Sequence, residues 1–68
     1  RVPLPGAIIK EGLLHMTSSF SGLQLEYQVH GQKWQVFQGP AKHQTQGDIR
    51  IRAKIPTTQI TSREQSLQ

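Results

Sequence analysis

Residues 23–37 read LQLEYQVHGQKWQVF, and this stretch is the strongest indicator of the fold. In its first half, apolar residues alternate with polar ones: Leu23, Leu25, Tyr27 and Val29 against Gln24, Glu26, Gln28 and His30. Side chains of a β-strand alternate with period two, so the pattern predicts a half-buried strand. After a turn over residues 30–33, Trp34 and Val36 share one face of a second strand, and Lys33, Gln35 and Phe37 share the other. Together the two strands make a predicted hairpin.

The aromatic side chains of this hairpin could form either a core or a ligand platform. We expect Tyr27 and Trp34 to lie in the core with Leu25 and the isoleucines of residues 49–51, because alternation groups them with aliphatic residues. Phe37 is out of phase with Trp34, so it is either exposed or turned by a β-bulge. Phe37, and Trp34 if it is exposed, are therefore candidate contacts for a sugar ring or for another domain.

Shorter patterns of the same kind occur along the rest of the chain. Residues 48–55 (DIRIRAKI) alternate, with Ile49, Ile51, Ala53 and Ile55 predicted to point inward and Pro56 ending the run. Further strands are predicted over residues 7–10, 13–17 and 58–63, with Glu11-Gly12 as a turn between the first two. Residues 18–22 and 39–47 are predicted loops, and the Phe20 side chain is expected to be tucked under the first of them. No window has a helical apolar period. The expected fold is all-β, a small antiparallel sandwich or barrel of about six strands.

Length and composition limit how this chain can be stabilised. It has 68 residues, 34% of them hydrophobic, and no cysteine, so neither a large core nor a disulfide holds it. We expect residues 1–6 to form a linker, residues 7–63 the sandwich domain, and residues 64–68 a frayed tail. Arg1 rather than methionine at the start suggests a fragment that gains stability by docking onto something larger. No apolar run approaches the roughly 20 residues that span a bilayer.

The sequence shows no pattern that is typical of an enzyme. Its carboxylate side chains, Glu11, Glu26, Asp48 and Glu64, are scattered over a turn, two outward strand faces and the tail, and we expect them to be solvated. His15, His30 and His43 lack the short spacing of a zinc motif. The serines of the 18–22 loop belong to no nucleophile motif. We therefore predict no catalytic residue, no metal and no cofactor in this chain.

A net charge of +4 raises the possibility of a nucleic-acid partner. Arg50, Arg52 and Lys54 form a basic face on one predicted strand, where they could contact phosphates while Trp34 or Tyr27 stacks on bases. The same residues also suit the polar face of a half-buried strand. Because the basic residues are scattered along the chain, we favour the solvated face and keep a single-stranded nucleic-acid binder as an alternative.

Several short motifs follow one another in a characteristic order. They are Pro5-Gly6-Ala7, the Gly12 turn, FSGLQLEY over residues 20–27, the turn from Gly31 to Lys33, Trp34, and IRIR over residues 49–52. This ordered set resembles the small C-terminal domain of bacterial chitobiases and β-N-acetylhexosaminidases, over roughly residues 2–63. The family turn commonly includes an aspartate, whereas this chain has a turn one residue shorter with His30.

The resemblance implies an immunoglobulin-like β-sandwich that follows the catalytic barrel of an exo-acting glycoside hydrolase. Such enzymes remove terminal N-acetylglucosamine from chitin oligosaccharides by substrate-assisted retaining hydrolysis. Their catalytic carboxylates lie in the barrel, so none is carried over to this chain. The resemblance therefore implies a non-catalytic accessory domain that packs on the barrel of the same polypeptide, in a periplasmic or secreted bacterial protein. A carbohydrate-binding module for N-acetylglucosamine-containing glycans is the alternative.

Overall fold

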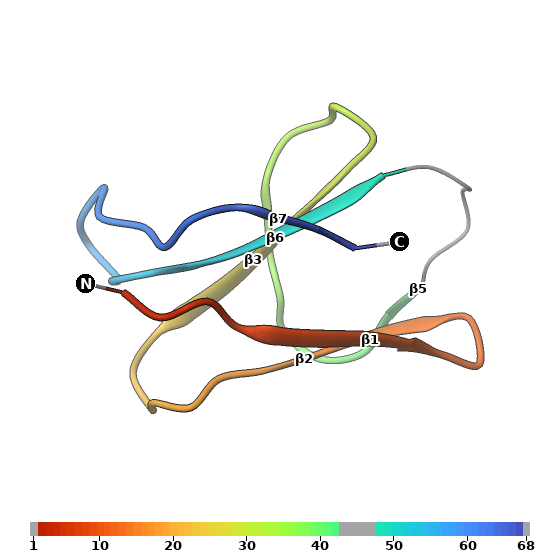
Figure 1. The fold of residues 1–68 in the computed structure, drawn as a ribbon, viewed down its shortest axis with the longest axis horizontal. Helices are drawn as coiled ribbons and strands as arrows, with labels where there is room; N and C mark the ends of the chain where they lie inside the picture. Colours follow the sequence, from red (N-terminus) through yellow and green to blue (C-terminus); the bar gives the residue numbers. More distant parts are fainter. Residues whose placement is uncertain (1, 43–47, 68) are drawn as a thin grey trace.

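The computed structural model describes residues 2–42 and 48–67, which form two antiparallel β-sheets (Figure 1). No helix occurs among these residues. The strands are β1 (Gly6–Lys10), β2 (Leu13–Thr17), β3 (Gln24–Val29), β4 (Gln35–Val36), β5 (Ala41–Lys42), β6 (Ile49–Lys54) and β7 (Gln65–Leu67). The prediction of an all-β sandwich is confirmed, with one strand more than the sequence indicated.

The order of the strands is that of an immunoglobulin-like sandwich. One sheet has the order β1-β2-β5 and the other the order β4-β3-β6-β7. The chain completes β1 and β2 in the first sheet, crosses to the second for β3 and β4, returns for β5 and crosses again for β6 and β7. In immunoglobulin lettering these sheets correspond to A-B-E and C′-C-F-G. With this order of strands, the apolar face of one sheet packs against the apolar face of the other.

Two tight turns fix the register of the sheets. Glu11 and Gly12 join β1 to β2 with φ angles of 54° and 77°, and Lys10 pairs directly with Leu13. His30 and Gly31 follow β3 with φ angles of 46° and 77°, and the amide of Gln32 donates to the carbonyl of Val29 at 2.9 Å. Two successive positive φ values define the type I′ turn, which suits the twist of antiparallel strands. The predicted turn at residues 11–12 and the hairpin of residues 23–37 are both confirmed.

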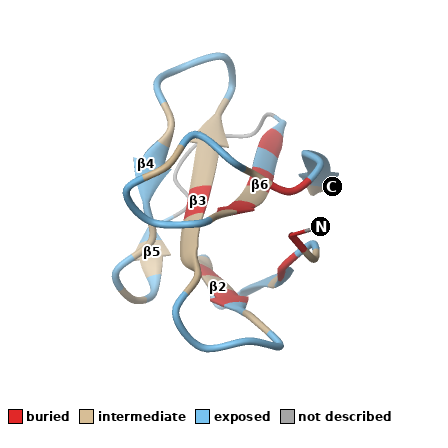
Figure 2. Cartoon of the chain, turned by 90° about the vertical axis from the view of Figure 1, so that its left-hand side faces the viewer, coloured by how far each residue is buried: buried red, intermediate tan, exposed pale blue. Residues whose placement is uncertain are grey.

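The core lies between β2 of one sheet and β6 of the other. Leu14 and Met16 face Ile49 and Ile51, and these four buried residues form its centre. Other apolar residues are partly buried around them, namely Ala7, Leu25, Tyr27, Val29, Phe37, Ala41 and Leu67. Figure 2 shows the buried positions of the core on β2 and β6. A core this small confirms that composition limits the apolar area available.

The last third of the chain differs from the sequence prediction. The final strand is β7, which pairs with β6 from Ile51↔Gln65 to Ile49↔Leu67, so the tail predicted over residues 64–68 is wrong for residues 65–67. Residues 58–63 make only an isolated bridge, Lys54↔Thr61. The β-branched residues of this segment are typical of a strand, but the Thr58 hydroxyl bonds the local backbone at Ile55 and Ile60 instead. Ile49, Ile51 and Ala53 point inward as predicted, whereas Ile55 lies beyond β6 and is exposed.

The two ends of the predicted domain also differ in detail. Residues 2–5 precede β1 without regular structure, but Val2 and Pro5 are buried, so this stretch packs onto the sandwich rather than standing away from it. β1 begins at Gly6, inside the predicted linker. The loop predicted over residues 39–47 includes the short strand β5, and residues 43–47 lie outside the described residues.

Candidate functional site

An apolar groove lies at one end of the sandwich. It forms where the leading segment (residues 2–5), the loop of residues 18–22 and the loop of residues 55–60 meet, all on the left of Figure 1. Figure 2 looks onto this end and shows the two loops as largely exposed. The groove holds about 470 Å³ and is lined by Val2, Pro3, Phe20, Ser21, Gly22, Leu23, Ile55 and Ile60. We call it the end groove.

The end groove exposes large apolar side chains to solvent. Phe20 is 61% exposed and Ile60 is 56% exposed, while Ile55 is also exposed. The prediction that Phe20 lies beneath its loop is therefore wrong. Among the described residues that line the end groove, none carries a charge. Contiguous exposed apolar surface of this kind makes the end groove a candidate contact site for another apolar surface.

Each of the two loops is held by one side-chain hydroxyl. Ser18 Oγ accepts a hydrogen bond from the amide of Phe20 at 3.2 Å and donates to the Phe20 carbonyl at 2.9 Å. In the same way, Thr58 Oγ1 accepts from the amide of Ile60 at 3.1 Å and donates to the Ile55 carbonyl at 2.7 Å. The amide of Ile55 also donates to the carbonyl of Ile60 at 3.0 Å. These bonds fix the backbone from which the exposed side chains project.

A second hollow lies on the other side of the leading segment. It holds about 410 Å³ between residues 2–4 and residues 61–63. Its wall includes the buried Ser62, whose amide donates to the Ala53 carbonyl at 2.8 Å and whose Oγ accepts from the Ala53 amide at 2.9 Å. Ser62 therefore satisfies both backbone groups of a residue in the core strand. Sequence reasoning missed Ser62, because it treated residues 58–63 as an ordinary strand.

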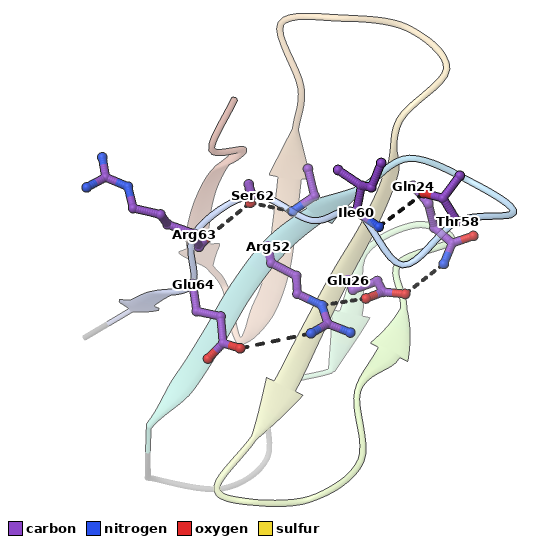
Figure 3. Close-up of polar contacts among 9 residues, drawn as sticks. Gln24, Glu26, Arg52, Thr58, Ile60, Ser62, Arg63 and Glu64 are labelled. Atoms are coloured by element: carbon purple, nitrogen blue, oxygen red, sulfur yellow. Dashed lines mark hydrogen bonds and ion pairs between the residues drawn. The ribbon is translucent and has the colours of Figure 1, made fainter. Parts of the chain in front are cut away.

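Charged residues form a network on the outer face of the β4-β3-β6-β7 sheet (Figure 3). Glu26 is only 6% exposed; its Oε1 accepts from Arg52 Nε at 2.7 Å and its Oε2 from Gln24 Nε2 at 2.7 Å. Arg52 also approaches Glu64, with 3.9 Å between Nη1 and Oε2, and Arg50 approaches the same carboxylate at 3.7 Å. The expectation that Glu26 is solvated is wrong, because Arg52 and Gln24 engage both of its oxygens.

Of the two aromatic residues of the hairpin predicted to lie in the core, Tyr27 does and Trp34 does not. Trp34 lies on the outer face, where its ring centroid is 4.0 Å from the Arg52 guanidinium carbon, so it is not a core residue. Phe37 is partly buried against the core, and its amide donates to the Leu25 carbonyl at 2.8 Å. Tyr27 does pack against the core, and its hydroxyl donates to Gln35 Oε1 at 3.2 Å. Alternation grouped Trp34 with Val36 and Gln35 with Phe37 correctly, but it does not say which group faces inward.

A family model and a relative of known function each match most of the chain. The family model of the chitobiase/β-hexosaminidase C-terminal domain matches residues 1–64. The chain belongs to this family. It is also 33% identical over 63 residues to the N,N′-diacetylchitobiase of Vibrio harveyi, a match that covers 93% of this chain and 7% of that protein. No solved structure matches the chain.

Residues of the family motifs come together in this chitobiase/β-hexosaminidase C-terminal domain. Three residues that are distant in sequence meet here: Glu26 of the LEY segment, Arg52 of the IRIR segment and Trp34 after the turn. Glu26 forms an ion pair with Arg52, and the Arg52 guanidinium stacks on the Trp34 ring. Arg52 occupies one side of the Trp34 ring and is paired with two carboxylates. The structure therefore gives these residues a structural role on the sheet surface.

The predicted basic face is part of the same outer face. Arg50, Arg52 and Lys54 share it, because they alternate with the buried residues of β6. Binding of sugar by Trp34 or Phe37, and of nucleic acid by this basic face, stays a prediction. In residues 2–42 and 48–67 there is no cluster of side chains suited to a metal ion and no helix that could cross a membrane. His43 lies outside that part of the chain.

Proposed function

We propose that this chain is a non-catalytic accessory C-terminal domain of a bacterial β-N-acetylhexosaminidase, and that it acts by packing on the catalytic barrel of the same polypeptide. The observation that carries the proposal is the family match over residues 1–64, which leaves almost no part of the chain for another module. The relative is a diacetylchitobiase, and this chain spans only 7% of its length. The parent of this chain would accordingly hydrolyse chitin oligosaccharides, outside the cytoplasm.

Three of the four carboxylate side chains of the chain support a non-catalytic role. Hydrolysis of a glycosidic bond requires carboxyl groups that can exchange protons or assist at one cleft. Both oxygens of Glu26 are engaged by Arg52 and Gln24, and Glu64 lies beside Arg50 and Arg52. Glu11 is in the tight turn between β1 and β2. The end groove, in contrast, is lined by uncharged residues and suits an apolar protein surface.

Removal of the domain tests this proposal. We expect the parent enzyme without residues 1–68 to keep its hydrolytic site but to unfold at a temperature lower by several degrees, because interdomain contacts are lost. Calorimetry and hydrolysis of N,N′-diacetylchitobiose measure the two effects, and the separate domain should release no sugar. An unchanged unfolding temperature, or hydrolysis by the domain alone, would contradict the proposal.

A further inference from the structure

We propose that the end groove is the surface on which the domain docks, and that its occupant is an apolar patch of the catalytic domain that precedes it in the same polypeptide. Phe20 and Ile60 are the anchors that enter this patch. The inference rests on the proposed function, and it specifies which of the faces of the sandwich makes the contact.

Exposure first distinguishes the end groove from the rest of the surface. Its two anchors project from different loops, yet they border one hollow together with the aliphatic Ile55 and Leu23. Other exposed apolar residues, such as Ile8 on β1 and Val36 on β4, line none of the hollows at this end. Exposed aromatic and aliphatic side chains around a concave surface are the usual centre of an interface, with polar residues outside it.

The hydroxyl bonds of Ser18 and Thr58 make the end groove suitable for binding. Each hydroxyl belongs to the residue two positions before an anchor and bonds the anchor's own backbone. Gly22, with a φ of 88°, completes the first loop in a conformation that few other residues adopt. A loop that is already ordered loses little conformational entropy on binding, so more of the contact energy is retained.

The position of the leading segment identifies the occupant. Val2 and Pro3 form one wall of the end groove, so a domain attached ahead of them is held next to it. Attachment in one polypeptide makes this contact intramolecular, and a flexible linker that spans the two sites gives an effective concentration of up to about millimolar, at which even a small apolar contact is occupied. The absence of charge among the described lining residues favours an apolar patch over an acidic or a basic partner.

Photo-crosslinking in the full-length parent enzyme tests the assignment. A benzophenone amino acid replaces Phe20 or Ile60 in the end groove, and Ile8 or Val36 outside it as controls. Ile8 is a close match for Ile60, since they are 58% and 56% exposed. After irradiation, mass spectrometry of the peptides shows which segment each position contacts. We expect cross-links from positions 20 and 60 to the catalytic domain, at several-fold higher yield than from positions 8 and 36.

The other outcomes separate this inference from the proposed function. Cross-links to the catalytic domain from position 8 or 36 alone, or at equal yield from all four positions, would overturn the end groove but leave interdomain packing intact. No cross-link to that domain from any position would contradict both. Cross-links from positions 20 and 60 to a second copy of the protein would replace the proposed occupant.

A pair of substitutions measures the strength of the contact. In the full-length enzyme, Ile60→Ser should raise the hydrogen-exchange rate of amides in the loops of residues 18–22 and 55–60 by about tenfold, which corresponds to about 1.4 kcal/mol of lost contact energy. Ile8→Ser removes an equally exposed isoleucine from β1 and should leave these rates unchanged. Equal effects of the two substitutions would contradict the role of Ile60.

Discussion

Side-chain contacts link β3 to β6 on the outer face of the larger sheet, and Glu26 is at their centre. Burial of a carboxylate is unfavourable unless hydrogen bonds and an opposite charge compensate for the loss of water. Arg52 and Gln24 supply these contacts, and the Trp34 ring stacks on the Arg52 guanidinium, adding a cation–π contact. Sequence alternation correctly placed Glu26 on the outer face, but it did not reveal that neighbouring strands would cover it.

Substitutions of the ion pair should show that its members depend on each other. Arg52→Met leaves the buried carboxylate of Glu26 without its cation and should lower the free energy of unfolding by about 3 kcal/mol. The double variant Glu26→Leu with Arg52→Met removes both charges and should be more stable than Arg52→Met alone. Urea titration followed by the fluorescence of Trp34 measures both values. A double variant as unstable as Arg52→Met, or less stable, would contradict the dependence.

Among the elements, the two tight turns are the parts that local sequence predicts best. Glycine at the second position of each turn suits a positive φ, because it has no Cβ to meet the following carbonyl. Glutamate and histidine at the first positions are less suited, and Glu11 has a φ of 54°. Strand ends are harder to predict. Residues 65–67 form the strand β7 because they pair with β6, and their short sequence QSL does not predict a strand.

Substitutions in the β1–β2 turn should change stability in opposite directions. Glu11→Asn should raise the free energy of unfolding by about 0.5 kcal/mol, because asparagine tolerates the left-handed conformation better than glutamate. Gly12→Ala should lower it by about 1 kcal/mol, since a Cβ is introduced at a φ of 77°. The urea midpoints measure the two changes, and the dependence on urea concentration should stay constant. Changes of the same sign would show that the turn conformation is not the cause.

At the scale of the whole molecule, a small core limits stability. Four buried apolar residues, Leu14, Met16, Ile49 and Ile51, join the two sheets. A domain of this length has a total stability of roughly 3–10 kcal/mol, so the loss of one core side chain removes a large part of it. Contacts with a neighbouring domain would then contribute substantially to the folded state, which agrees with the proposed docking role.

Truncation of the core should therefore have a much larger effect than truncation of the surface. Leu14→Ala should lower the free energy of unfolding by about 3 kcal/mol, because Leu14 is the most completely buried large side chain. The exposed Ile8→Ala is the matched control and should change it by no more than about 0.5 kcal/mol. Calorimetry of the domain measures both. Similar losses for the two variants would mean that β2 and β6 do not form the stabilising centre.

The sequence by itself determined the all-β class, the hairpin of residues 23–37, the turn at residues 11–12 and the inward set Ile49, Ile51 and Ala53. These features depend on period-two alternation and on glycine in tight turns, which are local properties of the chain. Only the tertiary structure decided that Trp34 faces outward, that Phe37 faces the core, and that residues 65–67 form a strand. It also decided that Phe20, Ile55 and Ile60 meet at one groove. Each of these depends on which distant segment lies alongside, and neither alternation nor turn chemistry specifies that partner.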